Sequence, residues 1–259
     1  MIELNRIYNM DCLEGMKRIP DKSVDMILCD LPYGTTACKW DTVIPFEPLW
    51  EQYERIIKDN GAIVLFGSEP FSSYLRLSNI KMYRYDWIWH KNFSGGFATA
   101  KRQPMKYHEI ISVFYKAQPT YNPQFQEYAD SVKVRFKEGD MVNRTKEAIS
   151  PTNKITGGLG YEGEQSISFI RGKYPESVQK FDGVPNCNGI RVHPTQKPVD
   201  LLEYLIKTYT NEGETVLDNC MGSGTTAVAC ININRNYIGF ELDQNYYKIA
   251  QERIKNLTT

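Results

Sequence analysis

Short apolar runs alternate with longer amphipathic segments along most of the chain. The runs predict buried strands at residues 6–11, 24–29, 62–66, 87–89, 110–115, 215–218 and 237–240. Apolar residues at helical spacing predict helices at 12–19, 47–58, 198–209, 225–231 and 244–255, with Asn60-Gly61 ending the second of them. Strands and helices that alternate in this order are typical of α/β domains with buried parallel strands.

Residues 118–190 break this pattern. Their apolar periodicity is weak, and polar residues, glycine and proline dominate, as in the glycine-rich segment 156–161. A stretch of this length is too long for an ordinary loop in a compact domain. We therefore expect an inserted, loop-rich region with a function of its own, between a first part at 1–117 and a last part at 191–259.

The charges are balanced overall but unevenly distributed. The chain of 259 residues has 31 basic and 31 acidic residues; residues 91–210 have 17 basic and 12 acidic ones, a net charge of +5, and the two ends are net acidic. Such a basic middle suits a polyanion, although ordinary variation of a solvated surface explains it as well. The length allows one substantial core.

Cysteine and histidine spacing argues against a metal site. The six cysteines form no Cys-x-x-Cys pair, the three histidines are scattered, and several cysteines lie in apolar runs, which indicates reduced thiols of a cytoplasmic protein. The amino terminus lacks the apolar segment of a signal peptide, and no apolar run reaches the length of about 20 residues that spans a bilayer. We expect no metal and no membrane contact.

A glycine turn follows the strand that ends at Asp218. Gly222 and Gly224 permit a tight turn and a close approach of a ligand to the backbone, and Thr225 opens a helix. The Lys-Ser/Thr ending of a P-loop is missing. Glu241 ends the next strand, where an acid can bind ribose hydroxyls. The pair predicts an adenosine-cofactor site, and a structural turn beside a surface acid is the alternative.

A second turn, Asp30–Tyr33, closes the strand 24–29. An exocyclic amine of adenine or cytosine is a poor nucleophile, because its lone pair is delocalised into the ring. Hydrogen bonds to Asp30 and to the Leu31 carbonyl favour a more electron-rich nitrogen, while Pro32 stiffens the turn and Tyr33 can stack on the base. A base inside a duplex has to be flipped out to reach such a site. A plain turn-forming Asp-x-Pro is the alternative for this match taken alone.

With these motifs the sequence resembles the N6-adenine/N4-cytosine amino-methyltransferases of DNA, a family that uses S-adenosylmethionine. Asp30–Tyr33 matches the family's Asp-Pro-Pro-Tyr catalytic turn, and Asp218–Thr226 matches its cofactor turn. Residues 9–13, 193–198 and 237–247 match three further cofactor segments. The match covers nearly the whole chain except about 118–190. The catalytic turn precedes the cofactor turn, as in the permuted β-type members.

The resemblance implies a doubly wound, mostly parallel seven-stranded sheet with one antiparallel strand. Residues 1–117 would then be the catalytic part, 118–190 the target-recognition region, and 191–259 the cofactor-binding part. The implied catalytic residues are Asp30, Leu31, Pro32 and Tyr33. The implied cofactor-binding residues are Asp11, Cys12, Asp30, Thr195, Lys197, Asp218, Cys220, Gly222, Ser223, Gly224, Thr225 and Glu241.

Two positions depart from the family pattern. Leu31 replaces a proline, which the backbone carbonyl tolerates, and Asn219-Cys220 replaces Pro-Phe, which puts a packing contact with the cofactor in doubt. The C5-cytosine enzymes need a Pro-Cys nucleophile, and this dipeptide does not occur in the chain.

The expected reaction is methylation of adenine N6 at a specific site in double-stranded DNA, by a monomer or homodimer. N4-cytosine methylation is the alternative, although that branch more often has Ser at position 30. RNA methylation and an inactive nucleic-acid-binding module are more distant alternatives. Basic residues expected to contact DNA, with a solvated surface as the alternative, are Lys101, Arg102, Lys106, Arg144, Arg171 and Lys173.

Overall fold

The structure is a computed structural model. It describes residues 2–35, 41–95, 97, 100–128, 130–131, 141–144, 163–166, 172–185 and 196–258, and for 141–144, 163–166 and 258 the backbone alone. The chain divides into two compact units. The larger comprises Met1–Asn122 and Glu176–Thr259, and the smaller comprises Pro123–Pro175.

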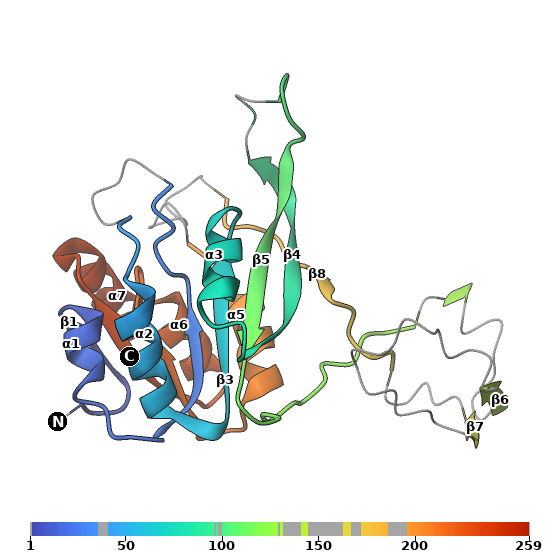
Figure 1. The fold of residues 1–259 in the computed structure, drawn as a ribbon, viewed down its shortest axis with the longest axis horizontal. Coiled ribbons are helices and arrows are strands. Elements are labelled where there is room, and N and C mark those ends of the chain that lie inside the picture. Colours follow the sequence, from blue (N-terminus) through green and yellow to red (C-terminus); the bar gives the residue numbers. More distant parts are fainter. Residues whose placement is uncertain are drawn as a thin grey trace. The chain divides into compact units, whose positions relative to one another are not determined.

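The larger unit is built on one mixed sheet (Figure 1). Its strands, in spatial order, are β1 (Arg6–Asn9), β10 (Asn236–Glu241), β9 (Thr215–Asp218), β2 (Val24–Cys29), β3 (Ile57–Gly67), β5 (Lys106–Phe114), β4 (Tyr83–Gly95) and β8 (Val178–Lys180). The first five are parallel, β5 is antiparallel to both neighbours, and β8 is parallel to β4. The expected α/β sheet with one antiparallel strand is confirmed. The described sheet has eight strands instead of seven, because the short β8 extends it.

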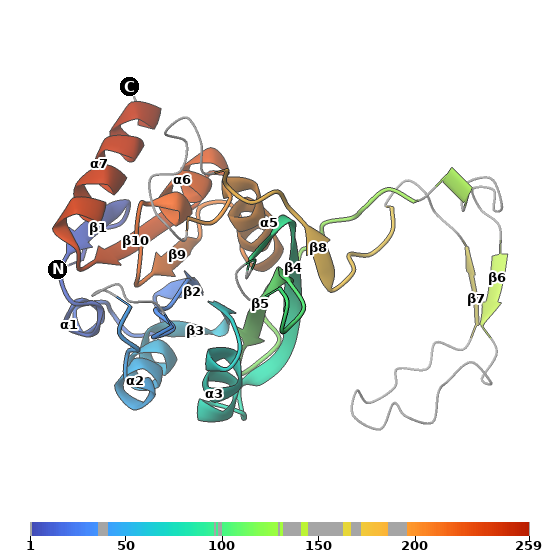
Figure 2. The same ribbon diagram turned by 90° about the horizontal axis from the view of Figure 1, so that it is seen from above.

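Helices cover both faces of the sheet (Figure 2). Helices α1 (Cys12–Met16), α2 (Phe46–Ile56) and α3 (Phe71–Ser78) cover one face, and α5 (Val199–Tyr209), α6 (Thr225–Asn232) and α7 (Gln244–Thr258) cover the other. Each face has its own apolar core, with Ile27 and Tyr53 in the first and Phe66 and Tyr209 in the second. Burial on both faces explains why the strands are apolar along their length. Among the described helices, none is long and apolar enough to cross a membrane.

The junction between α2 and β3 differs from the sequence prediction. Asn60-Gly61 was expected to end the helix, but this prediction is wrong: α2 ends at Ile56, and β3 begins at Ile57 and runs through both residues. The pairing of β2 with β3 shifts at this point. A Cβ atom on Gly61 would lie 2.8 Å from the carbonyl oxygen of Asp25. The glycine is therefore needed for close approach of two strands rather than for a helix end.

Strands β4 and β5 form a long hairpin that extends beyond the body of the larger unit (Figure 1). Its pairing runs from Tyr83 opposite Phe114 to Gly95 opposite Lys106. β4 has the same direction as β2, because both neighbours of β5 are antiparallel to it. The turn of the hairpin therefore projects from the edge where the parallel strands have their carboxyl ends.

The chain is held by the larger unit on both sides of the smaller one. Before it, the Asn122 amide donates to the Thr208 carbonyl at 2.7 Å, and its side chain donates to the Thr210 carbonyl at 3.1 Å. After it, β8 pairs with β4, and the indole of Trp89 donates to the Phe181 carbonyl at 2.8 Å. These bonds fix the two points at which the chain leaves and re-enters the larger unit.

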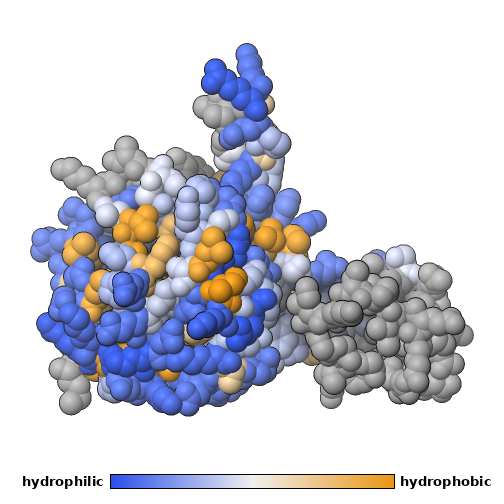
Figure 3. Space-filling model, in the orientation of Figure 1, coloured by the Kyte–Doolittle hydropathy of each residue, from blue (hydrophilic) through white to orange (hydrophobic). Residues whose placement is uncertain are grey.

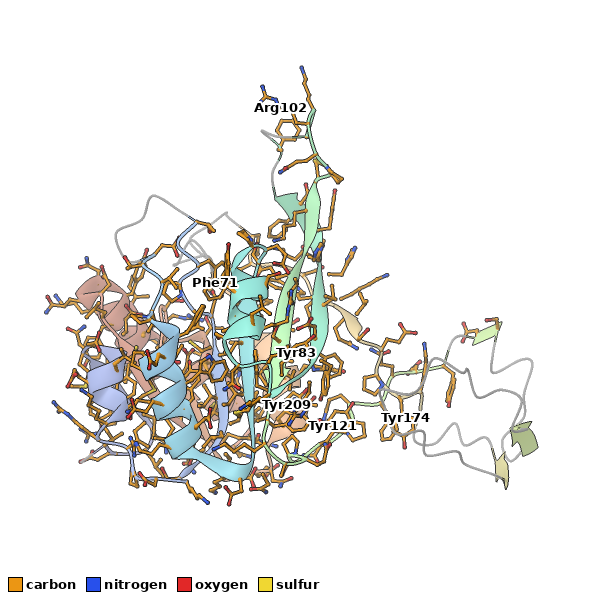
Figure 4. All side chains as sticks on the ribbon, in the orientation of Figure 1. Phe71, Tyr83, Arg102, Tyr121, Tyr174 and Tyr209 are labelled. Atoms are coloured by element: carbon orange, nitrogen blue, oxygen red, sulfur yellow. The ribbon has the colours of Figure 1, made fainter. Side chains whose placement is uncertain are left out.

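The smaller unit contains a two-stranded antiparallel sheet of β6 (Met141–Arg144) and β7 (Gly163–Ser166). Gln126 and Lys173 exchange backbone hydrogen bonds of 2.9 and 2.8 Å. The rings of Phe125 and Tyr174 pack with centroids 5.0 Å apart (Tyr174 is labelled in Figure 4). The unit lies within the predicted region 118–190, whereas β8, from the same region, belongs to the larger sheet. A role of the smaller unit in target recognition stays a prediction.

Candidate active site

Four carboxylates lie at the carboxyl edge of the parallel sheet. Asp11 and Asp30 follow β1 and β2, and Asp218 and Glu241 are the last residues of β9 and β10. Parallel strands place their carboxyl ends at one edge, where α/β proteins bind ligands. All four residues line a cavity of about 390 Å³. The predicted strand ends thus converge on one hollow.

The glycine turn after β9 forms one wall of this cavity. Asp218 accepts hydrogen bonds from the Cys220 amide at 3.0 Å and the Thr226 hydroxyl at 2.6 Å, which tie the strand end to the start of α6. Burial raises the pKa of Asp218 to about 6, although both bonds oppose the shift. Gly222 has φ 53°, in the left-handed region that glycine adopts without strain. Ser223 and Thr225 also line the cavity, and the predicted contact of this turn with a cofactor stays a prediction.

Gly224 has a different environment from its neighbours in the turn. Its φ is 82°, and a Cβ atom there would lie 2.9 Å from the Cβ atom of Ala250 on α7. It is not among the described residues that line the cavity. The structure therefore gives Gly224 a packing role, and its predicted cofactor contact stays a prediction.

Glu241 joins β10 to the glycine turn. Its carboxylate accepts from the Gly222 amide at 2.7 Å and from the Asp243 amide at 2.8 Å, one bond to each oxygen. Burial raises the pKa of Glu241, against these two backbone bonds. A carboxylate oxygen accepts more than one hydrogen bond, so both oxygens can still bind a ligand hydroxyl.

Cys12 and Cys220 line the cavity beside Asn219. The side chain of Asn219 accepts from the Tyr53 hydroxyl at 2.5 Å and faces the Cys220 sulfur at 3.6 Å. Asp11 accepts from the amides of Leu13 and Glu14, and thereby caps α1. Cys220 occupies the position at which the family pattern has Phe, and its small thiol lines the cavity.

The turn Asp30–Tyr33, which was predicted to be catalytic, lines the same cavity with all four of its residues. The Tyr33 hydroxyl donates to Asp30 Oδ1 at 2.5 Å, and the Tyr33 ring packs on Phe71 with centroids 5.0 Å apart. The Lys197 ammonium contacts Asp30 Oδ2. Burial raises the pKa of Asp30; Glu109 adds to the increase and Lys197 opposes it. The predicted stacking of Tyr33 on a base stays a prediction.

Lys197 lies between two acidic side chains. Its ammonium contacts Asp30 on one side and lies 3.4 Å from Glu109 Oε2 on the other, above the ring of Phe66. Burial alone would lower the pKa of Lys197, but the attraction of Asp30 and Glu109 outweighs it and raises the pKa. Lys197 therefore stays charged inside the site.

Several residues of this site could not be predicted from sequence patterns. Glu109 begins the apolar end of β5, and its buried carboxylate also binds Lys91 at 2.6 Å. Asp41 accepts from the amides of Gly34 and Thr35, both at 2.9 Å, and so fixes the chain after the catalytic turn. In the sequence, a single charged residue beside an apolar run looks the same whether it is solvated or buried. Its partners in the fold come from distant segments, so the sequence pattern does not show them.

The predicted DNA-contacting residues have different surroundings. Lys101 and Arg102 are exposed near the turn of the hairpin (Arg102 is labelled in Figure 4), and its outer end is hydrophilic (Figure 3). The Lys106 ammonium instead contacts the Ser68 hydroxyl, and burial lowers the pKa of Lys106. Lys173 lies in the smaller unit. Arg171 and Thr195 lie outside the described residues, as does the side chain of Arg144.

Within the described part of the chain, no group of three or more His, Cys, Asp or Glu side chains could hold a metal ion.

Comparisons with known proteins place this geometry in a family. The Type II methyltransferase M1.MboII of Moraxella bovis is 29% identical over 269 residues, which cover 96% of this chain and 96% of the relative. The DNA adenine methyltransferase YhdJ of Escherichia coli (strain K12) is 28% identical over 267 residues, which cover 97% of this chain and 83% of YhdJ.

Among solved structures, the M1.HpyAVI–SAM complex superposes with a TM-score of 0.61 at 24% sequence identity, and the match covers 96% of this chain and 98% of that one. The fold is therefore shared along almost the whole length. A sequence model described as DNA methylase, for N6 and N4 methyltransferases, matches residues 24–252. The chain belongs to this DNA methylase family.

Proposed function

We propose that this DNA methylase transfers a methyl group from S-adenosylmethionine to the N6 amine of an adenine at a specific site in double-stranded DNA. One observation carries the proposal. The Asp30 carboxylate and the turn that contains the Leu31 carbonyl line the same cavity as the glycine turn and Glu241. Two hydrogen-bond acceptors for an amine therefore lie in the same cavity as the proposed cofactor site.

The cavity suits S-adenosylmethionine in size and chemistry. Its volume of about 390 Å³ lies within the range of roughly 300–1,000 Å³ that is usual for small-ligand sites. Glu241 supplies acceptors for ribose hydroxyls, and the positive φ of Gly222 brings backbone to the cavity surface. Asp30 and Asp218 supply negative charge for the cationic methionine end, where Lys197 and Thr195 are the further proposed contacts. When bound, the cofactor supplies an electrophilic methyl group.

Asp30 prepares the nucleophile in the proposed reaction. It accepts a hydrogen bond from one N–H of the target amine, and the Leu31 carbonyl accepts from the other. These two hydrogen bonds would keep the nitrogen lone pair out of the ring system and available for attack. With the cofactor held by Glu241 and the glycine turn, transfer of its methyl group would form the N–C bond as the methyl–sulfur bond breaks, and the methylated nitrogen would then release one proton. Asp30 would be hydrogen-bonded to that nitrogen and can accept the proton, and burial, which raises the pKa of Asp30, makes it a better acceptor.

Adenine is favoured over cytosine as the target by Asp30 and by the similarity to an adenine methyltransferase, YhdJ. N4-cytosine methylation is the alternative within the same family. The chemistry of the amine is the same in both, so the shape of the base pocket decides between them. An inactive nucleic-acid-binding module is the alternative from another class, and it predicts no methyl transfer at all.

The proposed substrate is a duplex from which the target base is flipped into the cavity. Only 22% of the Asp30 side chain is exposed, so a paired base cannot reach it. Lys101 and Arg102 on the hairpin project from the same sheet edge and suit phosphate groups. We assign sequence readout to residues 118–190, and exchange of 123–175 for the corresponding unit of a relative should transfer the target preference. A monomer or homodimer, the permuted β-type order and a cytoplasmic location complete the proposal.

Methylation-sensitive sequencing tests the proposal directly. DNA from cells that express the protein should gain N6-methyladenine at one short motif, and DNA from cells that express Asp30→Ala should not. Methylation of cytosine N4 at a single motif would favour the alternative target. Unmodified DNA, together with purified protein that transfers no labelled methyl group, would contradict the enzymatic function.

A further inference from the structure

Four charged side chains form a continuous row from the catalytic turn to the base of the hairpin. Asp30 contacts Lys197, Lys197 lies 3.4 Å from Glu109, and Glu109 accepts from Lys91 at 2.6 Å. The exposed fractions of their side chains are 22%, 8%, 17% and 16% in this order. Two negative and two positive groups alternate, so the row is neutral although it is largely buried.

The row leaves a specific role for Glu109. A buried Lys197 paired with Asp30 alone would neutralise that carboxylate and weaken it as a hydrogen-bond acceptor. An ammonium has three N–H donors, and Glu109 is a second carboxylate that attracts the Lys197 ammonium, from 3.4 Å. The negative charge of Glu109 also raises the pKa of Asp30, whereas the charge of Lys197 lowers it. Glu109 therefore offsets part of the effect that Lys197 has on the catalytic carboxylate.

We propose that Glu109 is a positioning residue for methyl transfer, which acts through Lys197 and keeps Asp30 a strong acceptor for the target amine. The proposal rests on the proposed function, because it needs Asp30 to bind that amine. Glu109 itself touches neither the amine nor the methyl group. Its buried Oε2 atom supports this role, because that atom forms the ion pair with Lys197.

The alternative is that Glu109 only anchors the hairpin through Lys91. The two roles differ in their pH dependence. If Glu109 acts on Asp30, loss of its negative charge lowers the pKa of Asp30, and the acid limb of the rate moves to lower pH. Loss of the positive charge of Lys91 has the opposite sign and moves the acid limb to higher pH. A purely structural pair moves neither limb.

The test uses the full-length protein, S-adenosylmethionine with a labelled methyl group, and a duplex that carries the motif found by sequencing. Single-turnover transfer is measured across pH for wild type, Glu109→Gln, Glu109→Asp and Lys91→Gln. The matched control is Asp25→Asn, because Asp25 also pairs with a lysine, Lys58 at 2.6 Å, but lies near the opposite end of β2. Melting temperature and cofactor affinity are measured for every variant.

We expect Glu109→Gln to lower the single-turnover rate at neutral pH by about tenfold, a part of the effect that a positioned acid or base usually has. Cofactor affinity should stay within about threefold of wild type, a change of less than one kcal/mol. Its acid limb should move to lower pH, that of Lys91→Gln should move to higher pH, and Glu109→Asp should recover part of the rate. Asp25→Asn should lower the melting temperature and leave the acid limb in place.

The proposal would be overturned if the acid limb of the rate stayed at the wild-type pH in both Glu109→Gln and Lys91→Gln. It would also be overturned if the acid limb of Asp25→Asn moved as far as that of Glu109→Gln. If Glu109→Gln does not fold, the shift of Lys91→Gln to higher pH decides the question alone, and its absence counts against the proposal. Wild-type protein that methylates no DNA would contradict the proposed function instead. The two failures are therefore distinguishable.

Discussion

The Glu241 carboxylate accepts a hydrogen bond from the Gly222 amide at 2.7 Å and so joins the end of β10 to the glycine turn after β9. The same side chain accepts from the Asp243 amide through its other oxygen. One acid thus shapes the turn and offers acceptors to a ligand, and its replacement should affect the cofactor before it affects the fold.

We expect Glu241→Gln to weaken binding of S-adenosylmethionine by about 1–3 kcal/mol, or roughly 5- to 150-fold, because hydrogen bonds to a charged acceptor are lost. Titration calorimetry measures the change. Asp243→Asn is the matched control: Asp243 accepts from the amides of Asn245 and Tyr246 at the start of α7, and an asparagine oxygen can accept the same bonds. This control should therefore leave both stability and cofactor affinity near wild type. An unchanged dissociation constant for Glu241→Gln would move the ribose acceptor to another residue.

Asp30→Asn should abolish methyl transfer, since the amide carries no charge for the target amine. It should weaken cofactor binding less than Glu241→Gln does, because Asp218 remains as a negative charge at the methionine end. Glu109 remains as a partner for Lys197 in this variant, so the buried ammonium is not left alone. A labelled-methyl assay and calorimetry on the same preparation separate the two effects. Activity near the wild-type level would exclude Asp30 as the catalytic acceptor.

Cofactor affinity should fall as the pH decreases from about 7.5 to about 5.5, because the pKa of Asp218 is raised to about 6. Protonation removes the negative charge that Asp218 presents to the cationic methionine end of the cofactor, so the attraction between them weakens. The dissociation constant, measured at several pH values, should rise through this range. A constant affinity would contradict the prediction.

The effect of Asp218 on stability has the opposite direction. Folding raises its pKa from 3.8, so the folded state favours the protonated form. Its contribution to stability is complete below pH 3.8 and is lost as the pH rises through about 6. Unfolding driven by Asp218 therefore cannot explain a loss of affinity in acid, and melting curves at each pH provide the control.

Lys101 and Arg102, which are exposed near the turn of the hairpin, should contact DNA phosphates. Residues 91–107 include four basic residues and no acidic one, which suits a phosphate backbone. Each phosphate contact contributes about −0.9 to the slope of log affinity against log salt, so alanine at both positions should make the slope shallower by up to about 1.8. The loss should be similar for specific and unrelated duplexes. Lys81→Ala, before β4 and at its opposite end, should leave the slope unchanged; an unchanged slope in the double variant would place the phosphate contacts elsewhere.

Strand ends were the most predictable part of this protein. Apolar runs in the sequence predicted β2, β9 and β10. The acidic residue at the end of each run, Asp30, Asp218 or Glu241, was then predicted as a site residue. Parallel strands bring such ends to one edge, so the order of elements was enough to place these three groups together. The prediction needed no knowledge of side-chain contacts.

Contacts between distant segments were not predictable in the same way. In the sequence, Gly61 resembles a helix terminator, and only its close approach to Asp25 in the fold shows its role. Lys106 resembles a surface lysine in the sequence, but in the fold its ammonium contacts Ser68. Glu109 gains its importance from Lys197, which lies 88 positions later in the chain. Three residues of β8 pair with β4, although nothing in their own pattern distinguishes them from the surrounding polar segment.

The hydrogen bonds of Asn122 and the pairing of β8 have a consequence for the length of the chain between them. Both ends of this segment are fixed by the larger unit, so the entropy cost of closing its flexible parts grows only slowly with their length. Each doubling of such a segment costs only about 0.6 kcal/mol. Insertions and deletions there are thermodynamically cheap, and the segment can diverge in length and sequence while selection keeps the transfer site unchanged.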